Sequence, residues 1–213
     1  MSTVSITTPT TDTYAGLKTS FAYRRRIAIT VICVLVGLSG TLMTPPDVIE
    51  GTPQDHFCDS LGWSTLIAAI LLRLWSSTHI AGRKSQALVT TGPYAVCRNP
   101  LYVGTLLIAI SQMLILKSWP FALASVMPIV LYVVGVVPSE EHLLRQRFGS
   151  LYAEYCERVP RWTPKWSSLN LELGSPENSI PFRRECILCA WWCLLPLASE
   201  FICGLRELIW PAV

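Results

Sequence analysis

Charged residues are scarce in this 213-residue chain. Asp, Glu, Lys and Arg together make up 15% of it, whereas 51% of the residues are hydrophobic. Soluble domains carry about 25% charged residues, so this composition excludes an ordinary soluble enzyme and indicates a membrane protein. The sequence also lacks a glycine-rich loop of the kind that grips phosphates. We expect no nucleic-acid partner.

Four apolar stretches approach the roughly 20 residues that a helix needs to cross a bilayer. They cover residues 27–43, 61–80, 101–116 and 119–138. A small-residue cleavage site would make the first stretch a signal peptide, but Thr44-Pro45-Pro46 follows it, so we interpret it as a true helix. Only Lys117-Ser118 separates the last two stretches, which predicts a tight antiparallel hairpin.

Lys and Arg are missing from residues 45–60, which instead contain four acidic side chains. Basic residues flank the opposite ends of the apolar stretches, at Arg24 to Arg26, Arg83, Lys84 and Arg98. Because Lys and Arg are retained on the cytoplasmic side, we expect a cytoplasmic N-terminus. Counting spans then places residues 83–100 and the segment after Pro138 together on the cytoplasmic face.

A fifth apolar stretch, residues 186–205, contains Glu200 as its only charge. We expect it to span the membrane, although Pro196 and Glu200 leave an interfacial or re-entrant helix as an alternative. The predicted organisation is an all-α, polytopic membrane helical bundle. It has a disordered segment (1–26), a core with four transmembrane helices (27–166), a linker (167–185) and an added C-terminal helix without chemistry of its own (186–213).

Cysteine is not rare, since the chain has eight, but its pattern does not indicate a metal site. Cys186, Cys189 and Cys193 share a helical face inside an apolar segment with no nearby His. Free Cys behaves as a small buried hydrophobe, so we expect packing and no metal. His56 and His142 lack a convincing constellation and are interpreted as solvated.

The loop before the third apolar stretch contains Gly92-Pro93-Tyr94 and Asn99-Pro100. Gly92 tolerates backbone angles that other residues avoid, and Pro100 suits the first position of a helix. Unpaired backbone groups there, with the faces and hydroxyls of Tyr94 and Tyr102, could contact an adenine or a ribose. An ordinary helix cap with interfacial tyrosines is the other interpretation of this loop.

Glu140 and Glu141 follow the fourth apolar stretch directly, at the membrane boundary. Two carboxylates in that place suit a cationic ligand. They could equally stabilise the start of a helix capped by Ser139, and the residues alone leave both interpretations open. We expect Gly149 to divide the helix that follows. Arg73 is interpreted as structural, whereas His79 lies close enough to the loop to contact a ligand.

Together these motifs resemble the isoprenylcysteine carboxyl methyltransferase and phospholipid methyltransferase superfamily of integral-membrane enzymes. The resemblance covers roughly residues 73–164. Its pattern is matched in order by Leu88-Val89, Gly92 to Tyr94, Arg98 to Gly104, Glu140-Glu141, Phe148-Gly149, Tyr152 to Tyr155 and Val159 to Arg161.

The resemblance implies an S-adenosylmethionine site at the cytoplasmic ends of the core helices. The cofactor-binding residues that it implies are His79, Gln86, Ala87, Leu88, Val89, Gly92, Tyr94, Asn99, Pro100, Leu101, Tyr102, Glu140 and Glu141. Asn99 replaces the usual His and thereby excludes an obligatory histidine base. Val136 stands where eukaryotic prenylcysteine enzymes carry an arginine, which argues against a prenylcysteine carboxylate as substrate.

The implied reaction is in-line transfer of a methyl group from a sulfonium, which needs alignment and desolvation more than acid–base help. We therefore assign no catalytic residue. The acceptor would enter from the lipid and would be a lipid-like or small apolar molecule with a carboxylate, amine or thiol. Two alternatives stay open: a membrane reductase that uses a nicotinamide cofactor, and a non-catalytic membrane scaffold. The oligomeric state cannot be read from the sequence.

Overall fold

The computed structural model describes residues 21–81, 87–171, 174 and 180–211, and it places most of them in helices. Four described helical segments are long and apolar enough to cross a membrane: Arg25–Leu42, Pro53–Ile80, Trp119–Phe148 and Phe182–Ile209. The shorter apolar helix Pro100–Leu116 runs among them. The predicted all-α membrane bundle is therefore confirmed. The disordered segment expected at the N-terminus lies mostly outside the described residues.

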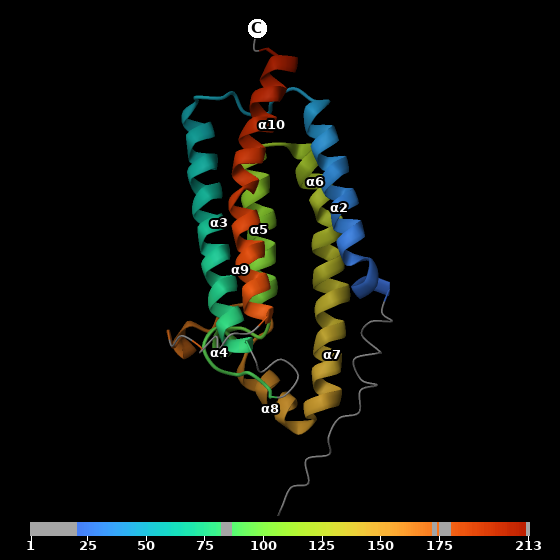
Figure 1. Ribbon diagram of the computed structural model, residues 1–213, viewed down its shortest axis with the longest axis vertical. Helices are drawn as coiled ribbons and strands as arrows, with labels where there is room; N and C mark the ends of the chain where they lie inside the picture. Colours follow the sequence, from blue (N-terminus) through green and yellow to red (C-terminus); the bar gives the residue numbers. More distant parts are fainter. Residues whose placement is uncertain (1–20, 82–86, 172–173, 175–179, 212–213) are drawn as a thin grey trace, which may run out of the picture.

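The long helices stand side by side and alternate in direction (Figure 1). Helix α2 (Phe21–Leu42) packs on α6 (Trp119–Val130), while α3 (Pro53–Ile80) packs on α5 (Pro100–Leu116). The loop between α2 and α3 and the turn between α5 and α6 meet at one end, drawn at the top of Figure 1. The short helices α4 (Pro93–Val96) and α8 (Ser150–Arg158) lie at the other end.

Helix α3 begins eight residues before the apolar stretch predicted for it. Thr52 caps the helix by accepting a hydrogen bond from the Asp55 amide, and Pro53 takes the first position. The ammonium group of Lys117 lies 2.5 Å from a carboxylate oxygen of Asp55 and 2.7 Å from one of Asp59. Hydropathy places these acidic residues outside the helix, but their partner from the α5–α6 turn allows them to lie within it.

The predicted hairpin between the third and fourth stretches is confirmed. Lys117 closes α5 with a left-handed backbone angle, φ 45°, and its amide donates to the Met113 carbonyl. Helix α6 then starts at Trp119.

The helix that contains the fourth apolar stretch continues past Pro138. Helix α6 passes through the π-helical turn η1 (Leu131–Val136) directly into α7 (Val137–Phe148). Val136 is helical, and the Ser139 hydroxyl donates to the Gly135 carbonyl instead of capping a new helix. The capping interpretation of the glutamate pair is therefore wrong, because the pair lies inside a continuous helix.

The C-terminal apolar stretch forms α9 (Ile180–Cys193) and α10 (Leu195–Ile209), and the two run as one bent rod along the bundle. The bend falls at Leu194, just before Pro196, which cannot donate a backbone hydrogen bond. Helix α9 contacts α3, and α10 contacts α5. The described segment is long and apolar enough to span the membrane, which favours the spanning interpretation over the interfacial one.

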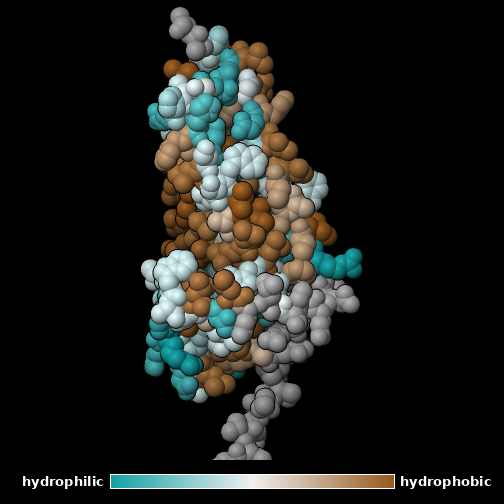
Figure 2. Space-filling view, turned by 90° about the vertical axis from the view of Figure 1, so that its left-hand side faces the viewer, coloured by the Kyte–Doolittle hydropathy of each residue, from teal (hydrophilic) through white to brown (hydrophobic). Residues whose placement is uncertain are grey.

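The surface carries a band of apolar side chains around its middle. Figure 2 shows this band in brown, with polar residues gathered above and below it. On α3, Ile67 and Leu71 are 54% and 61% exposed. Exposure of so much apolar surface is unfavourable in water, whereas in a membrane it is an ordinary contact with lipid. The chain is an integral membrane protein.

Candidate functional site

The predicted site residues come from segments that gather at the α4–α8 end of the bundle (Figure 1). The loop from Ala87 leads into α4, Asn99 precedes α5, and α7 descends beside them. Gln86 lies outside the described residues. Ala87 is exposed, whereas Leu88 packs on the cluster formed by Tyr152, Tyr155 and Val159.

Gly92 allows the end of α3 to touch this loop. Its φ is 60°, which favours glycine, and a Cβ built on it would lie 2.2 Å from the Nε2 atom of His79. His79 is 5% exposed, and its Nδ1 lies 3.1 Å from the Trp75 carbonyl. That contact fits a proton on Nδ1, which leaves Nε2 directed at Gly92. The two residues, predicted separately, therefore lie together.

Tyr94 points a hydroxyl group into the protein without a partner. The residue is 8% exposed, and among the described residues none forms a hydrogen bond with its hydroxyl oxygen. Its carbonyl accepts a 2.7 Å hydrogen bond from the Tyr155 hydroxyl, which fixes the backbone here. Burial raises the pKa of the Tyr94 phenol well above its ordinary value, and the charges of Tyr155 and Glu140 raise it further. A buried hydroxyl without a hydrogen-bond partner is unusual, and a bound ligand could supply the missing partner.

Both carboxylate oxygens of Glu141 accept hydrogen bonds from protein groups. Its side chain is 8% exposed, and one of its oxygens accepts a 2.8 Å hydrogen bond from the Asn99 amide. The other oxygen accepts two from the guanidinium of Arg161, at 3.0 and 2.6 Å. The Nε atom of Arg98 lies 3.7 Å away. Glu141 therefore joins α7 to the start of α5 and to the segment after α8.

Backbone pairing strengthens the same junction. The Arg98 amide donates to the Pro160 carbonyl at 2.9 Å, and the Lys165 amide donates to the Val96 carbonyl at 3.0 Å. The hydrogen bond from Arg161 to Glu141 also raises the pKa of the Arg161 guanidinium. The sequence identifies Arg161 only as part of a motif, because nothing in its position, 20 residues after Glu141, indicates an ion pair.

Glu140 differs from its neighbour. It is partly exposed, and no residue in the described part of the chain forms a salt bridge or side-chain hydrogen bond with it. Its charge contributes to the raised pKa of Tyr94, so the two groups lie near enough to interact electrostatically. Among the described residues, a carboxylate without a counter-charge and a buried hydroxyl without a partner lie within electrostatic range of each other, which suits a cationic ligand that also has polar groups.

The aromatic wall of the site comes from two halves of the bundle. Tyr102 on α5 and Tyr132 on η1 lie with ring centroids 5.9 Å apart. Tyr152 and Tyr155 on α8 are 1% and 3% exposed, and burial raises the pKa of both phenols. Gly149, with φ 52°, separates α7 from α8 as predicted, so that α8 can fold back beneath the bundle. Pro100 is buried and starts α5, also as predicted.

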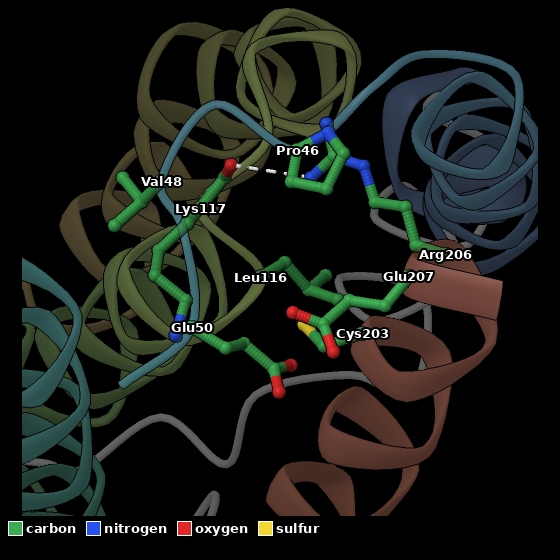
Figure 3. A pocket seen from close by; sticks show the side chains of 8 residues that line it. All are labelled: Pro46, Val48, Glu50, Leu116, Lys117, Cys203, Arg206 and Glu207. Carbon is green, nitrogen blue, oxygen red and sulfur yellow. Dashed lines mark hydrogen bonds between the residues drawn. The ribbon is translucent and has the colours of Figure 1, made fainter. Parts of the chain in front are cut away.

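A small cavity lies at the opposite end of the molecule, between α10 and the α2–α3 loop (Figure 3). Its lining residues are Pro46, Val48, Glu50, Leu116, Lys117, Cys203, Arg206 and Glu207. Arg206 donates to the Lys117 carbonyl at 3.4 Å and to the Pro45 carbonyl, so its guanidinium joins α10 to the α5–α6 turn and to the α2–α3 loop. No group of His, Cys, Asp or Glu among the described residues is arranged to hold a metal ion.

Comparisons with known proteins come from two directions. The model of the phospholipid methyltransferase family matches residues 61–150. Protein-S-isoprenylcysteine O-methyltransferase B of Arabidopsis thaliana is 31% identical over 54% of this chain and 63% of its own length. No solved structure matches.

Two bacterial relatives cover more of the chain. The nickel-cobalt-cadmium resistance protein NccN of Alcaligenes xylosoxydans xylosoxydans is 33% identical over 81% of this chain and 80% of its own length. The cobalt-zinc-cadmium resistance protein CzcN of Cupriavidus metallidurans is 29% identical over 85% and 83%.

Proposed function

Because the chain belongs to the isoprenylcysteine carboxyl methyltransferase and phospholipid methyltransferase superfamily, we propose that it transfers a methyl group from S-adenosylmethionine to a lipid-like or small apolar acceptor. The site is the α4–α8 end of the bundle. The observation that carries the proposal is the buried Tyr94 hydroxyl, which has no hydrogen-bond partner among the described residues and lies within electrostatic range of Glu140.

The residues of this end fit the donor by their chemistry. S-adenosylmethionine supplies a methyl group on a positive sulfur, and it also carries an ammonium, a ribose and an adenine. Glu140 would hold the ammonium, and the Tyr94 hydroxyl would gain the hydrogen-bond partner that it lacks. The faces of Tyr94 and Tyr102 would lie near the sulfonium. The loop 87–89, Gly92, His79 and residues 99–101 would complete the enclosure.

We assign the two glutamates different roles. Glu140 contacts the donor, whereas Glu141 has its oxygens occupied by Asn99 and Arg161 and holds the loop in place. Asn99 can donate to Glu141 and, unlike a His, carries no titratable ring. The chain's own contribution to methyl transfer is then alignment and exclusion of water.

Most of the described basic residues that flank the spans lie at the site end, including Arg98, Arg145 and Arg147, so we propose that this end faces the cytoplasm. Lys117 and Arg206 lie at the other end, where Lys117 pairs with two acidic residues. The apolar surface band supports entry of the acceptor from within the membrane. NccN and CzcN are named for resistance to nickel, cobalt, zinc and cadmium, and they span four fifths of the chain. We propose that the methyl transfer serves tolerance to such divalent metals.

Calorimetric titration of S-adenosylmethionine and its demethylated product into the detergent-purified protein tests the donor site. We expect saturable binding that Glu140→Gln and Tyr94→Phe each weaken about tenfold, the effect of one lost polar contact to a charged ligand. Glu154→Gln, an exposed position on α8, is the matched control and should bind as wild type does. A folded wild-type protein that binds neither compound, in detergent or in nanodiscs, would leave the reductase and the scaffold as the candidates.

Tolerance is tested in a bacterial host that carries the gene. Cells that express wild type should grow at higher cobalt or cadmium concentrations than cells that express Glu140→Gln at equal abundance. Equal growth of the two strains would refute the proposed role in metal tolerance and would leave the proposed donor site unaffected.

A further inference from the structure

Arg73 lies within α3, about 10 Å from the end of that helix at Ile80, and is almost enclosed. Its side chain is 12% exposed, and Glu185 on α9 is its counter-charge. The Nε and Nη2 atoms of Arg73 both lie 2.7 Å from one oxygen of Glu185. The ring of Trp192, two turns further along α9, lies 4.2 Å from the guanidinium carbon.

The remaining nitrogen of Arg73 reaches the start of α5. Nη1 donates to the Leu101 carbonyl at 3.0 Å and to the Thr105 hydroxyl at 2.6 Å. Gly104 makes room for this reach, because a Cβ there would lie 2.4 Å from the Arg73 Cγ. The guanidinium therefore joins α9 to the turn of α5 that directly follows Asn99.

A second contact brings the C-terminal part to the same place. Gly174, in the segment before α9, packs on the last turn of α3, where a Cβ would lie 2.5 Å from the Thr78 carbonyl and 2.9 Å from the His79 Cα. The C-terminal part thus touches both sides of the predicted donor site: the His79 end of α3 and, through Arg73, the first turn of α5.

We propose that Glu185 is a positioning residue for the methyl-donor site, acting through Arg73 on the first turn of α5. The inference rests on the proposed function. It assigns a role in the site to α9, which lies outside residues 61–150 that the family model matches, and it differs from the expectation that the C-terminal part carries no chemistry. Without the Glu185 carboxylate, the Arg73 guanidinium would lose its counter-charge and turn toward water or lipid headgroups, and the Leu101 and Thr105 contacts would go with it.

The experiment measures binding of S-adenosylhomocysteine to the full chain in detergent, together with the melting temperature without ligand. We expect Glu185→Ala to raise the Kd about tenfold or more, the loss expected when one or two polar ligand contacts are misplaced. Glu185→Asp, which keeps the charge, should restore most of the affinity.

Glu185→Ala could also unfold the protein, because it leaves a buried guanidinium without a counter-charge. The double variant Arg73→Met/Glu185→Leu avoids this, since it replaces the whole pair by apolar side chains that suit a membrane. It should fold and melt near the wild-type temperature, yet bind the ligand as weakly as Glu185→Ala, because the contacts to Leu101 and Thr105 are gone. If the pair had only a structural role, Glu185→Ala would lower the melting temperature, and the double variant would keep the wild-type Kd.

Ser199→Ala is the matched control on the same rod. It removes the 2.8 Å hydrogen bond from Ser199 to Gln112, which docks α10 on the half of α5 away from the site. Its Kd should stay at the wild-type value. Wild-type affinity in the double variant, or an equal loss in Ser199→Ala, would overturn the inference. Failure of wild type itself to bind would instead refute the proposed function.

Discussion

Removal of the Glu141 carboxylate should be among the most damaging single changes at the site end. The side chain is 8% exposed, and its loss would strip Asn99 of its acceptor and leave Arg98, 13% exposed, without a counter-charge. Breaking a buried pair in this way costs about 3–5 kcal/mol. For a chain of this size we expect Glu141→Ala to lower the melting temperature by about 6–20 °C, at 2–4 °C per kcal/mol.

The same structure predicts a much smaller effect from the other side of the pair. Arg161 has 42% of its side chain exposed, so water and salt screen its interaction with Glu141. Arg161→Ala should cost only about 1 kcal/mol, because the Asn99 donor and Arg98 still compensate the carboxylate. Glu141→Gln should fall between the two, since an amide oxygen still accepts from Asn99 while the charge is lost.

The assay is thermal unfolding of the four proteins in one detergent, followed by helical circular dichroism, at low and at high salt. Salt should reduce the effect of Arg161→Ala and change that of Glu141→Ala little. The reasoning fails if Glu141→Ala melts within about 2 °C of wild type, which at the same conversion is less than 1 kcal/mol, or if Arg161→Ala is equally destabilising.

Three further predictions concern single contacts. Gly92→Ala should abolish donor binding and lower stability, because its φ of 60° and the 2.2 Å approach to His79 leave no room for a Cβ; isothermal titration and melting measure both, and normal binding would contradict the geometry. Lys117→Met should cost about 3–5 kcal/mol by leaving Asp55 and a second carboxylate unpaired at the far end, with donor affinity unchanged in a folded sample. Burial raises the pKa of Tyr94 above its ordinary 10, so the stability that this phenol contributes is fully present below pH 10 and should be lost as the pH rises through the raised pKa. The Tyr94→Phe variant loses no hydrogen bond to a described residue and should flatten the alkaline limb of a curve of melting temperature against pH.

Hydropathy was enough to predict the bundle, because a bilayer imposes length and apolarity on each span. It was not enough where a charge is compensated from elsewhere. Asp55 and Asp59 argue against a helix when they are read alone, and only the fold brings Lys117, some 60 residues later, to neutralise them. The C-terminal rod was expected on length alone, and its pairing with Arg73 across more than 100 residues leaves no local signal.

The site shows the same division. Local backbone chemistry predicted Gly92, Pro100 and Gly149 correctly, because turns and helix starts depend on neighbouring residues. The two adjacent glutamates could not be told apart, since neighbours on a helix differ by only a rotation of about 100°. What each one faces depends on where the span before them began and how tightly it is wound.

That winding has a consequence for how such a protein can vary. Six residues of π-helix, Leu131–Val136, join α6 to α7 and fix the rotation of α7 about the helix axis relative to α6. Insertions of this kind shift every later side chain around the axis, so a gain of one residue in this apolar stretch would turn Glu140 toward Asn99 in place of Glu141, and a loss of one residue would turn His142 toward it. Length in this part of the chain is therefore more tightly constrained than composition: a Val for a Leu changes little, while one inserted residue would move Glu140 into the place of Glu141, and one deleted residue would leave no carboxylate in that place.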